Sequence, residues 1–297
     1  MIEVSVEAIA SLAQYYDQLI RCFTFGDFQL VPTIEEFEGI LGCPLGRRKP
    51  YLFFGFYPSM EIVAKVVKIS AQELDRLKQK MSGVVGIPRQ HLEEKAKSLA
   101  DQEEWTSFMD ILALLVFGIV LLPNVDGLVD LAAIDTFLAY HHNKESPVIA
   151  ILANAYDTFD LRCQKSSVRI VCCTPALYVL LVSHVFCHEG RPVCPLQGHR
   201  MCAEKGKANW EELLAGMVGA SVSWFPQWKE GWARVLYLCE GFPNVPLMRT
   251  RGCINYNPIL AIRQLGYPMR GALSEEIITP FVARGFSEGN AKMLQRI

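Results

Sequence analysis

No apolar run in this 297-residue sequence is long enough to cross a bilayer. A membrane-spanning helix needs about 20 consecutive apolar residues. The run from Ile111 to Leu122 stops at Pro123. The run from Ile170 to Phe186 is interrupted by proline and histidine. Both runs are therefore predicted to be core helices, and no membrane partner is expected.

An excess of charge and an export signal are also absent. With a formal net charge of -2, the chain has no general attraction for phosphate backbones, so nucleic-acid binding would need a local basic patch. The opening residues MIEVSVEAIA carry acidic charge where a secretory signal carries basic charge, and no apolar segment follows. We therefore predict an intracellular protein of the nucleus or cytoplasm whose ten cysteines are reduced thiols.

The sequence also lacks a nucleotide-binding motif. Lys205, Gly206 and Lys207 resemble the end of a phosphate-binding loop. However, Met201 stands in place of the first glycine, and Ala208 stands in place of the serine or threonine. No Walker site is therefore predicted.

What the sequence does contain is one long apolar stretch, from Trp105 to His142. Between residues 109 and 122 the only polar residue is Asp110, so apolar side chains cover every face of a helix drawn there. Pro123 ends this helix, and a second helical pattern follows. Its apolar face carries Leu131, Ile134, Leu138 and His141. We predict a helical hairpin, at about 107–142, that is buried on all sides.

The rest of the chain is predicted to pack around this hairpin as an irregular multi-helix globular domain of the mainly α class. Residues 22–30 and 242–256 have no helical period and are expected to form a small β element. Thr33 and Glu36 form a capping box at the start of a short helix. We expect residues 1–297 to form a single domain. The unfinished helical pattern of the last residues, AKMLQRI, predicts that the chain is a fragment of a longer protein.

Two further helices are predicted to begin at proline signals. Ser146 and Pro147 start the first, and Thr174 and Pro175 start the second. The second helix is expected to end at Gly190. One of its faces carries Leu177, Leu181, His184 and His188.

Six histidines and cysteines fall within nineteen residues, between positions 184 and 202. Zinc is held by four such groups in a tetrahedron, and a helix end followed by a tight loop can bring them together. The predicted metal ligands are Cys187, Cys194, His199 and Cys202, with His184 or His188 as alternates. The spacing matches no recognised zinc-finger signature, and ordinary core or loop residues are the other interpretation. A bound zinc would be structural, and no other cofactor is predicted.

A basic triplet, Arg47, Arg48 and Lys49, precedes a cluster of aromatic residues. The aromatic residues are Tyr51, Phe53, Phe54, Phe56 and Tyr57. Surfaces that bind single strands combine basic and aromatic side chains in this way. The segment is therefore interpreted either as a nucleic-acid contact or as a solvated basic loop whose aromatic rings pack into the core.

An enzymatic interpretation needs side chains that converge on one point. The acidic residues Asp126, Asp130 and Asp135, near His141 and His142, offer the groups of a metal-dependent nuclease. At these spacings, however, the carboxylates are expected to scatter around a helix and its preceding turn. No catalytic residue is predicted.

Four stretches resemble the plant mobile domain family, which is also labelled aminotransferase-like. They are FTFGDFQLVPTIEEFEGILGCP (residues 23–44), ALLVFGIVLLPN (113–124), SWFPQW (223–228) and INYNPILAIRQLG (254–266). The resemblance spans nearly the whole chain and is strongest to uncharacterised, transposon-associated legume members. It implies a mainly helical plant protein, found in mobile elements and in host genes kept for nuclear functions such as silencing and genome maintenance. It supplies no catalytic residues.

The sequence and this resemblance together predict a non-enzymatic interaction scaffold of transposon origin, which acts with protein partners in nuclear nucleoprotein complexes. Two alternatives stay open. The first is an enzyme, a nuclease or transferase, that uses the His/Cys loop at 184–202 or the region from Asp126 to His142. The second is direct nucleic-acid binding through Arg47, Arg48 and Lys49.

Overall fold

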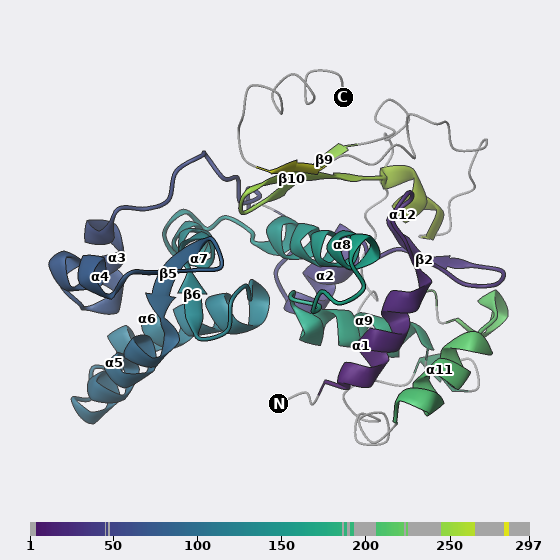
Figure 1. The fold of residues 1–297 in the computed structure, drawn as a ribbon, viewed down its shortest axis with the longest axis horizontal. Coiled ribbons are helices and arrows are strands. Elements are labelled where there is room, and N and C mark those ends of the chain that lie inside the picture. The colour runs from purple at the N-terminus through teal and green to yellow at the C-terminus, as the bar shows by residue number, and fades with distance from the viewer. Residues whose placement is uncertain are drawn as a thin grey trace.

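The computed structural model describes residues 4–44, 46, 48–185, 187–188, 191–192, 206–222, 224, 245–264 and 282–284. This part of the chain is mainly α-helical and carries short antiparallel sheets (Figure 1). The predicted fold class is therefore confirmed at that level. Within the described residues, no helix combines the length and the apolar character that a bilayer crossing needs.

The α-helices are α1 (Val6–Leu12), α2 (Ile34–Leu41), α3 (Met60–Val67), α4 (Ala71–Leu77), α5 (Arg89–Asp101), α6 (Trp105–Val116), α7 (Leu131–Asn143), α8 (Val148–Gln164), α9 (Thr174–Val185), α11 (Lys207–Ala215) and α12 (Pro258–Gln264). A π-helical turn, η2 (Phe117–Leu121), continues α6. Two 3₁₀ turns, η1 (Ala13–Tyr15) and η3 (Gly219–Ser221), follow α1 and α11.

The strands form small antiparallel sheets. One sheet contains β1 (Tyr16–Asp17), β2 (Cys22–Thr24) and β3 (Gln29–Leu30); a second contains β4 (Gln79–Met81), β5 (Val84–Pro88) and β6 (Leu128–Asp130). A third contains β9 (Val245–Arg249), β10 (Gly252–Tyr256) and β11 (Val282–Arg284), and β7 (Cys187–His188) pairs with β8 (Arg191–Pro192). The strands predicted at 22–30 and within 242–256 are confirmed, but they lie in different sheets rather than in one β element.

The sheet β4-β5-β6 is absent from the sequence prediction. Strands β4 and β5 form a β-hairpin whose turn residues are Ser82 and Gly83, and their φ angles of 50° and 81° are both positive. Two positive φ angles are the requirement of a type I′ turn, which matches the twist of the flanking strands. Strand β6 lies in the connection between α6 and α7 and pairs with β5, with Ile87 opposite Val129. This long-range pairing has no local sequence signal.

The start of α2 follows the prediction. The Thr33 hydroxyl accepts a hydrogen bond from the Glu36 amide (3.1 Å), and the Glu36 carboxylate accepts one from the Thr33 amide (3.0 Å). Gly42 closes the helix in the left-handed conformation, with φ of 60°. The capping box and the glycine stop signal are both confirmed, because each depends only on neighbouring residues.

Two large hydrophobic clusters, rather than one hairpin, organise the described part of the chain. The larger surrounds α8 and α9 and includes side chains of α1, α2 and the sheet β1-β2-β3. The smaller lies among α3, α5, α6, α7 and β5. Figure 1 shows the elements of the smaller cluster as a lobe at the left and α8 and α9 in the larger lobe at the right. The expectation that everything packs around residues 107–142 is therefore wrong.

The hairpin helices occupy the predicted positions, but the hairpin is not buried on all sides. Helix α6 packs against α3, α5 and α7. Its Ile111 and Leu114 are buried, whereas Met109 and Leu112 are 57% and 40% exposed. Because α6 has apolar side chains on every face, its sequence does not show which face packs against another element. The prediction of burial on all sides is therefore wrong.

The helix predicted from Thr174 to Gly190 is shorter than expected. Helix α9 ends at Val185, and His188 lies in β7, paired with Arg191 of β8. The helical spacing that placed His188 in line with His184 is therefore accidental. Gly190 lies outside the described residues.

The close approach of β5 and η2 to Val129 yields a stability prediction. A Cβ atom on Gly86 would lie 2.2 Å from the Val129 carbonyl oxygen, and one on Gly118 would lie 2.6 Å from its Cγ1. Gly86→Ala is therefore expected to lower the free energy of unfolding by about 1–3 kcal/mol through overpacking. Urea denaturation measures the change. Gly26→Ala is the control, because its Cβ would meet no atom within 4 Å, and an equal loss in both variants would contradict the steric explanation.

Candidate interaction surface

An exposed apolar stripe runs along α6 and η2. Its members and their exposed fractions are Trp105 (59%), Met109 (57%), Leu112 (40%), Val116 (42%) and Val120 (36%). Successive members are four, three, four and four residues apart, which places them on one helical face. At 1.5 Å rise per residue the stripe is roughly 20 Å long. We refer to these five residues as the α6 stripe.

The opposite face of the same helix is packed. Ile111 and Leu114 are at most 1% exposed and belong to the smaller cluster. Helix α6 is therefore held firmly from one side, while its other side presents large apolar groups to solvent. Single exposed apolar residues are ordinary on protein surfaces, but a contiguous stripe on one rigid element is typical of an interaction site.

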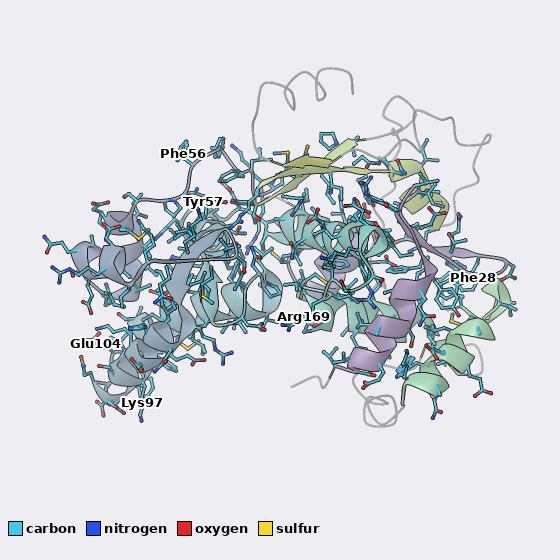
Figure 2. All side chains as sticks on the ribbon, in the orientation of Figure 1. Phe28, Phe56, Tyr57, Lys97, Glu104 and Arg169 are labelled. Carbon is cyan, nitrogen blue, oxygen red and sulfur yellow. The ribbon has the colours of Figure 1, made fainter. Side chains whose placement is uncertain are left out.

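The two ends of the stripe are fixed by specific contacts. At the start, the Trp105 ring lies edge-to-face with Phe108 at 6.0 Å between centroids. At the end, the π-helical turn carries Val120, and Gly118 of that turn contacts Val129 closely. Glu104, labelled in Figure 2, marks the start of α6 and adds negative charge where the helix dipole favours it. The stripe is thus presented by a fixed helix rather than a loose loop.

Charged groups flank the stripe and leave its centre apolar. Asp110, on the side of α6, pairs with His141 of α7 at 3.1 Å between oxygen and Nε2. No charged residue follows Asp110 within α6 or η2. An apolar strip with polar edges is the usual anatomy of a protein–protein interface.

The predicted zinc ligands are placed only in part. Cys194, His199 and Cys202 lie outside the described residues, and for Cys187 and His188 the structure describes only the backbone of β7. His184 is fully buried, and its Nε2 is 2.8 Å from a Glu36 carboxylate oxygen. Within the described residues, no group of three potential ligands gathers around one point. The zinc site stays a prediction. Measurement of the zinc content of the wild type and of Cys194→Ser tests it.

The acidic residues of the enzymatic interpretation do not converge. Asp126 pairs with Arg169 at 2.6 Å on the surface, whereas Asp135 accepts a hydrogen bond from the buried Tyr51 hydroxyl. Asp130 caps α7 by accepting a hydrogen bond from Ala132 N (3.0 Å). Each carboxylate has a structural partner of its own.

Two clefts, of ≈ 350 and ≈ 330 Å³, meet at Pro123 and Asn124, and neither was foreseen. The arginines that line them are Arg89, Arg169, Arg249 and Arg251, and each pairs with a carboxylate at 2.6–2.7 Å. Their positive charges are therefore matched locally, and the clefts carry no excess charge from these arginines for an anion. The arginines and their partners are mostly far apart in the sequence, which left no local motif.

The basic triplet is placed in part as well. Arg48 and Lys49 are exposed, and Arg47 lies outside the described residues. The Arg48 guanidinium lies 5.2 Å from the centroid of the Tyr140 ring. The aromatic residues divide between the two interpretations: Tyr51 and Phe53 are buried, whereas Phe54 is exposed.

The described part of the chain is thus a mainly α-helical protein with a solvent-exposed apolar helix face. It belongs to the family described as a domain of unknown function (DUF7745), whose profile matches residues 1–297. No curated protein and no solved structure matches the chain. The family description names no activity, ligand or partner.

Proposed function

We propose that this chain is a non-enzymatic interaction scaffold and that the α6 stripe is its principal contact surface for a protein partner. The observation that carries the proposal is the stripe itself: five large apolar side chains share one face of a helix whose other face is packed. Burial of apolar area contributes about 25 cal/mol per Å², so covering this face with a partner supplies a driving force for association.

The cellular setting of the proposal comes from sequence resemblance. The similarity of residues 23–44, 113–124 and 254–266 to plant mobile domain proteins implies a transposon origin and a role in nuclear nucleoprotein complexes. Part of that resemblance, ALLVFGIVLLPN, includes Val116 and Val120 of the stripe. The proposal therefore joins a surface feature to one of the segments that resemble the family.

The stripe can be tested by placing charge on it. Met109→Glu with Leu112→Glu should leave the fold intact, because both side chains are already exposed, and should abolish specific partner recovery from plant nuclei. Loss of a central hot-spot residue costs about 2 kcal/mol or more of binding free energy, which is roughly a thirtyfold loss of affinity. Quantitative mass spectrometry of the recovered proteins gives the readout.

Leu19→Glu supplies the matched control. Leu19 is 57% exposed, so the same chemical change is made at an apolar surface residue away from α6. The control should retain every partner that the wild type recovers. If the double variant recovers the same partners as the wild type, or if the wild type recovers none, the scaffold proposal is wrong.

A further inference from the structure

A second surface lies on the segment that joins α2 to α3. Two backbone hydrogen bonds fix the segment to the turn between α7 and α8: Ser146 N donates to Lys49 O (2.7 Å), and Tyr51 N donates to Ser146 O (2.9 Å). Pro50 and Ser146 form a parallel bridge at the same place. These contacts hold the start of the segment in place. We refer to residues 49–57 as the strap.

The strap buries alternate aromatic side chains. Tyr51 and Phe53 are 2% and 8% exposed and pack with Ala139 and Ala150. Phe53 also lies 5.0 Å from the Tyr57 ring, measured between centroids. Because side chains of an extended chain alternate in direction, this anchoring turns Leu52 and Phe54 outward, and the chain then bends at Gly55 (φ 94°) before Phe56.

The outward residues are apolar and strongly exposed. Phe54 and Phe56 are each 74% exposed, and Leu52 is 42% exposed. Figure 2 shows Phe56 on the connection between the two lobes, at the outer edge of the molecule. Two phenyl rings are thus displayed by a strap whose other side is anchored, so little ordering of the chain is needed before they bind a flat ligand.

Beside the strap lies a basic hollow of ≈ 490 Å³. It is lined by Arg48, Lys49, Asn143, Lys144 and Glu145. Three cations face one carboxylate, which leaves two positive charges in excess on a chain whose formal net charge is -2. Lys144 is held there by its Nζ hydrogen bond to His141 O (3.0 Å) and by its position as the C-cap of α7.

We propose that the hollow and the strap together bind single-stranded nucleic acid. Arg48, Lys49 and Lys144 contact phosphates, and the exposed faces of Phe54 and Phe56 stack on bases. Stacking on aromatic rings combined with a positive groove is the general chemistry of single-strand binding. This inference does not depend on the α6 stripe, because the two surfaces share no residue.

The chemistry favours a single strand over a duplex or an acidic peptide. Phenyl faces can stack only on bases that are unpaired and unstacked, which excludes the interior of a duplex. An acidic peptide would satisfy the three cations but would leave the two phenylalanines without planar partners. The chain from residue 49 to residue 56 extends at most about 25 Å, which suits a site of a few nucleotides.

The experiment measures fluorescence anisotropy of labelled ten-nucleotide oligo(dT) and oligo(U) with the full chain. The expected slope of log affinity against log salt is about -2, from three phosphates at about 0.7 each on a single strand. Lys49→Ala should reduce the slope by about 0.7. Phe54→Ala and Phe56→Ala should each weaken binding by about fivefold or more without changing the slope.

Matched controls and competing ligands make the result decisive. Lys80→Ala, at an exposed lysine of β4, and Leu19→Ala, at an exposed apolar residue outside both proposed surfaces, should leave the affinity unchanged. Comparison of the two oligonucleotides assigns the preference for DNA or RNA, and preference for either supports the proposal. Absence of binding at about 100 µM protein overturns it. Equal binding of polyglutamate or of a duplex, insensitive to Phe54→Ala, also overturns it.

Discussion

Asp160→Ala is expected to lower the free energy of unfolding by about 3–5 kcal/mol, because it removes the buried carboxylate that pairs with the buried charge of Arg21. Arg21 and Asp160 are 2% and 1% exposed. The guanidinium donates to one Asp160 oxygen from Nε (3.1 Å) and Nη2 (2.7 Å), and the Tyr16 hydroxyl donates to the other (3.0 Å). The substitution therefore breaks a charge pair and removes a hydrogen-bond acceptor within the larger cluster.

Urea denaturation followed by circular dichroism measures this loss. Asp75→Ala is the control, since Asp75 pairs with Lys78 at 2.9 Å on the surface, where both side chains are at least 35% exposed. An exposed pair of this kind contributes about 0–1 kcal/mol. If the free energy of unfolding of Asp160→Ala is within about 1 kcal/mol of the wild-type value, the buried pair contributes no more than a surface pair does.

Glu36→Ala should cause a loss of similar size, about 3–5 kcal/mol, because Glu36 connects three helices from a fully buried position. It closes the capping box of α2 with Thr33 and lies 2.8 Å from Nε2 of His184 in α9. The amide of Gln264 in α12 donates to both of its carboxylate oxygens (3.2 Å each). Removing the carboxylate takes an acceptor from the Thr33 amide and breaks the contact with His184, and the Gln264 amide keeps only its bond to Val31 O (2.9 Å). A buried donor left unsatisfied costs about 1–3 kcal/mol.

The matched control for Glu36 is another glutamate near the start of a helix. Glu73 follows the N-cap Ser70 of α4 by three residues, as Glu36 follows Thr33, but Glu73 is exposed. Glu73→Ala should therefore change the free energy of unfolding by less than about 1 kcal/mol. Thermal and urea unfolding of both variants give the comparison, and equal losses would show that local capping alone explains the role of Glu36.

The features that were predictable from the sequence are local ones. Thr33, Glu36 and Gly42 signal the ends of α2 through contacts between near neighbours, and the structure has them as predicted. The buried role of Glu36 was not predictable, because His184 and Gln264 lie 148 and 228 residues away in the chain. Sequence spacing alone pointed instead to His184 as a possible metal ligand.

The α6 stripe was missed for a different physical reason. A helix with polar and apolar faces shows which side is buried, whereas α6 is apolar nearly all round. Its exposed Met109 and its buried Ile111 have the same kind of side chain, so only the positions of α3, α5 and α7 distinguish them. The tertiary arrangement, and not the composition of the helix, creates the candidate surface.

The most direct test of the central claim is site-specific photocrosslinking from the stripe in plant nuclei. A photoreactive amino acid at Leu112 should give a discrete protein adduct, since the side chain is 40% exposed at the centre of the stripe. The same group at Leu19 should give no such adduct, and Val116→Glu should suppress the adduct formed at position 112. Absence of an adduct at Leu112, or the same adduct from Leu19, would contradict the account of α6 as an interaction surface.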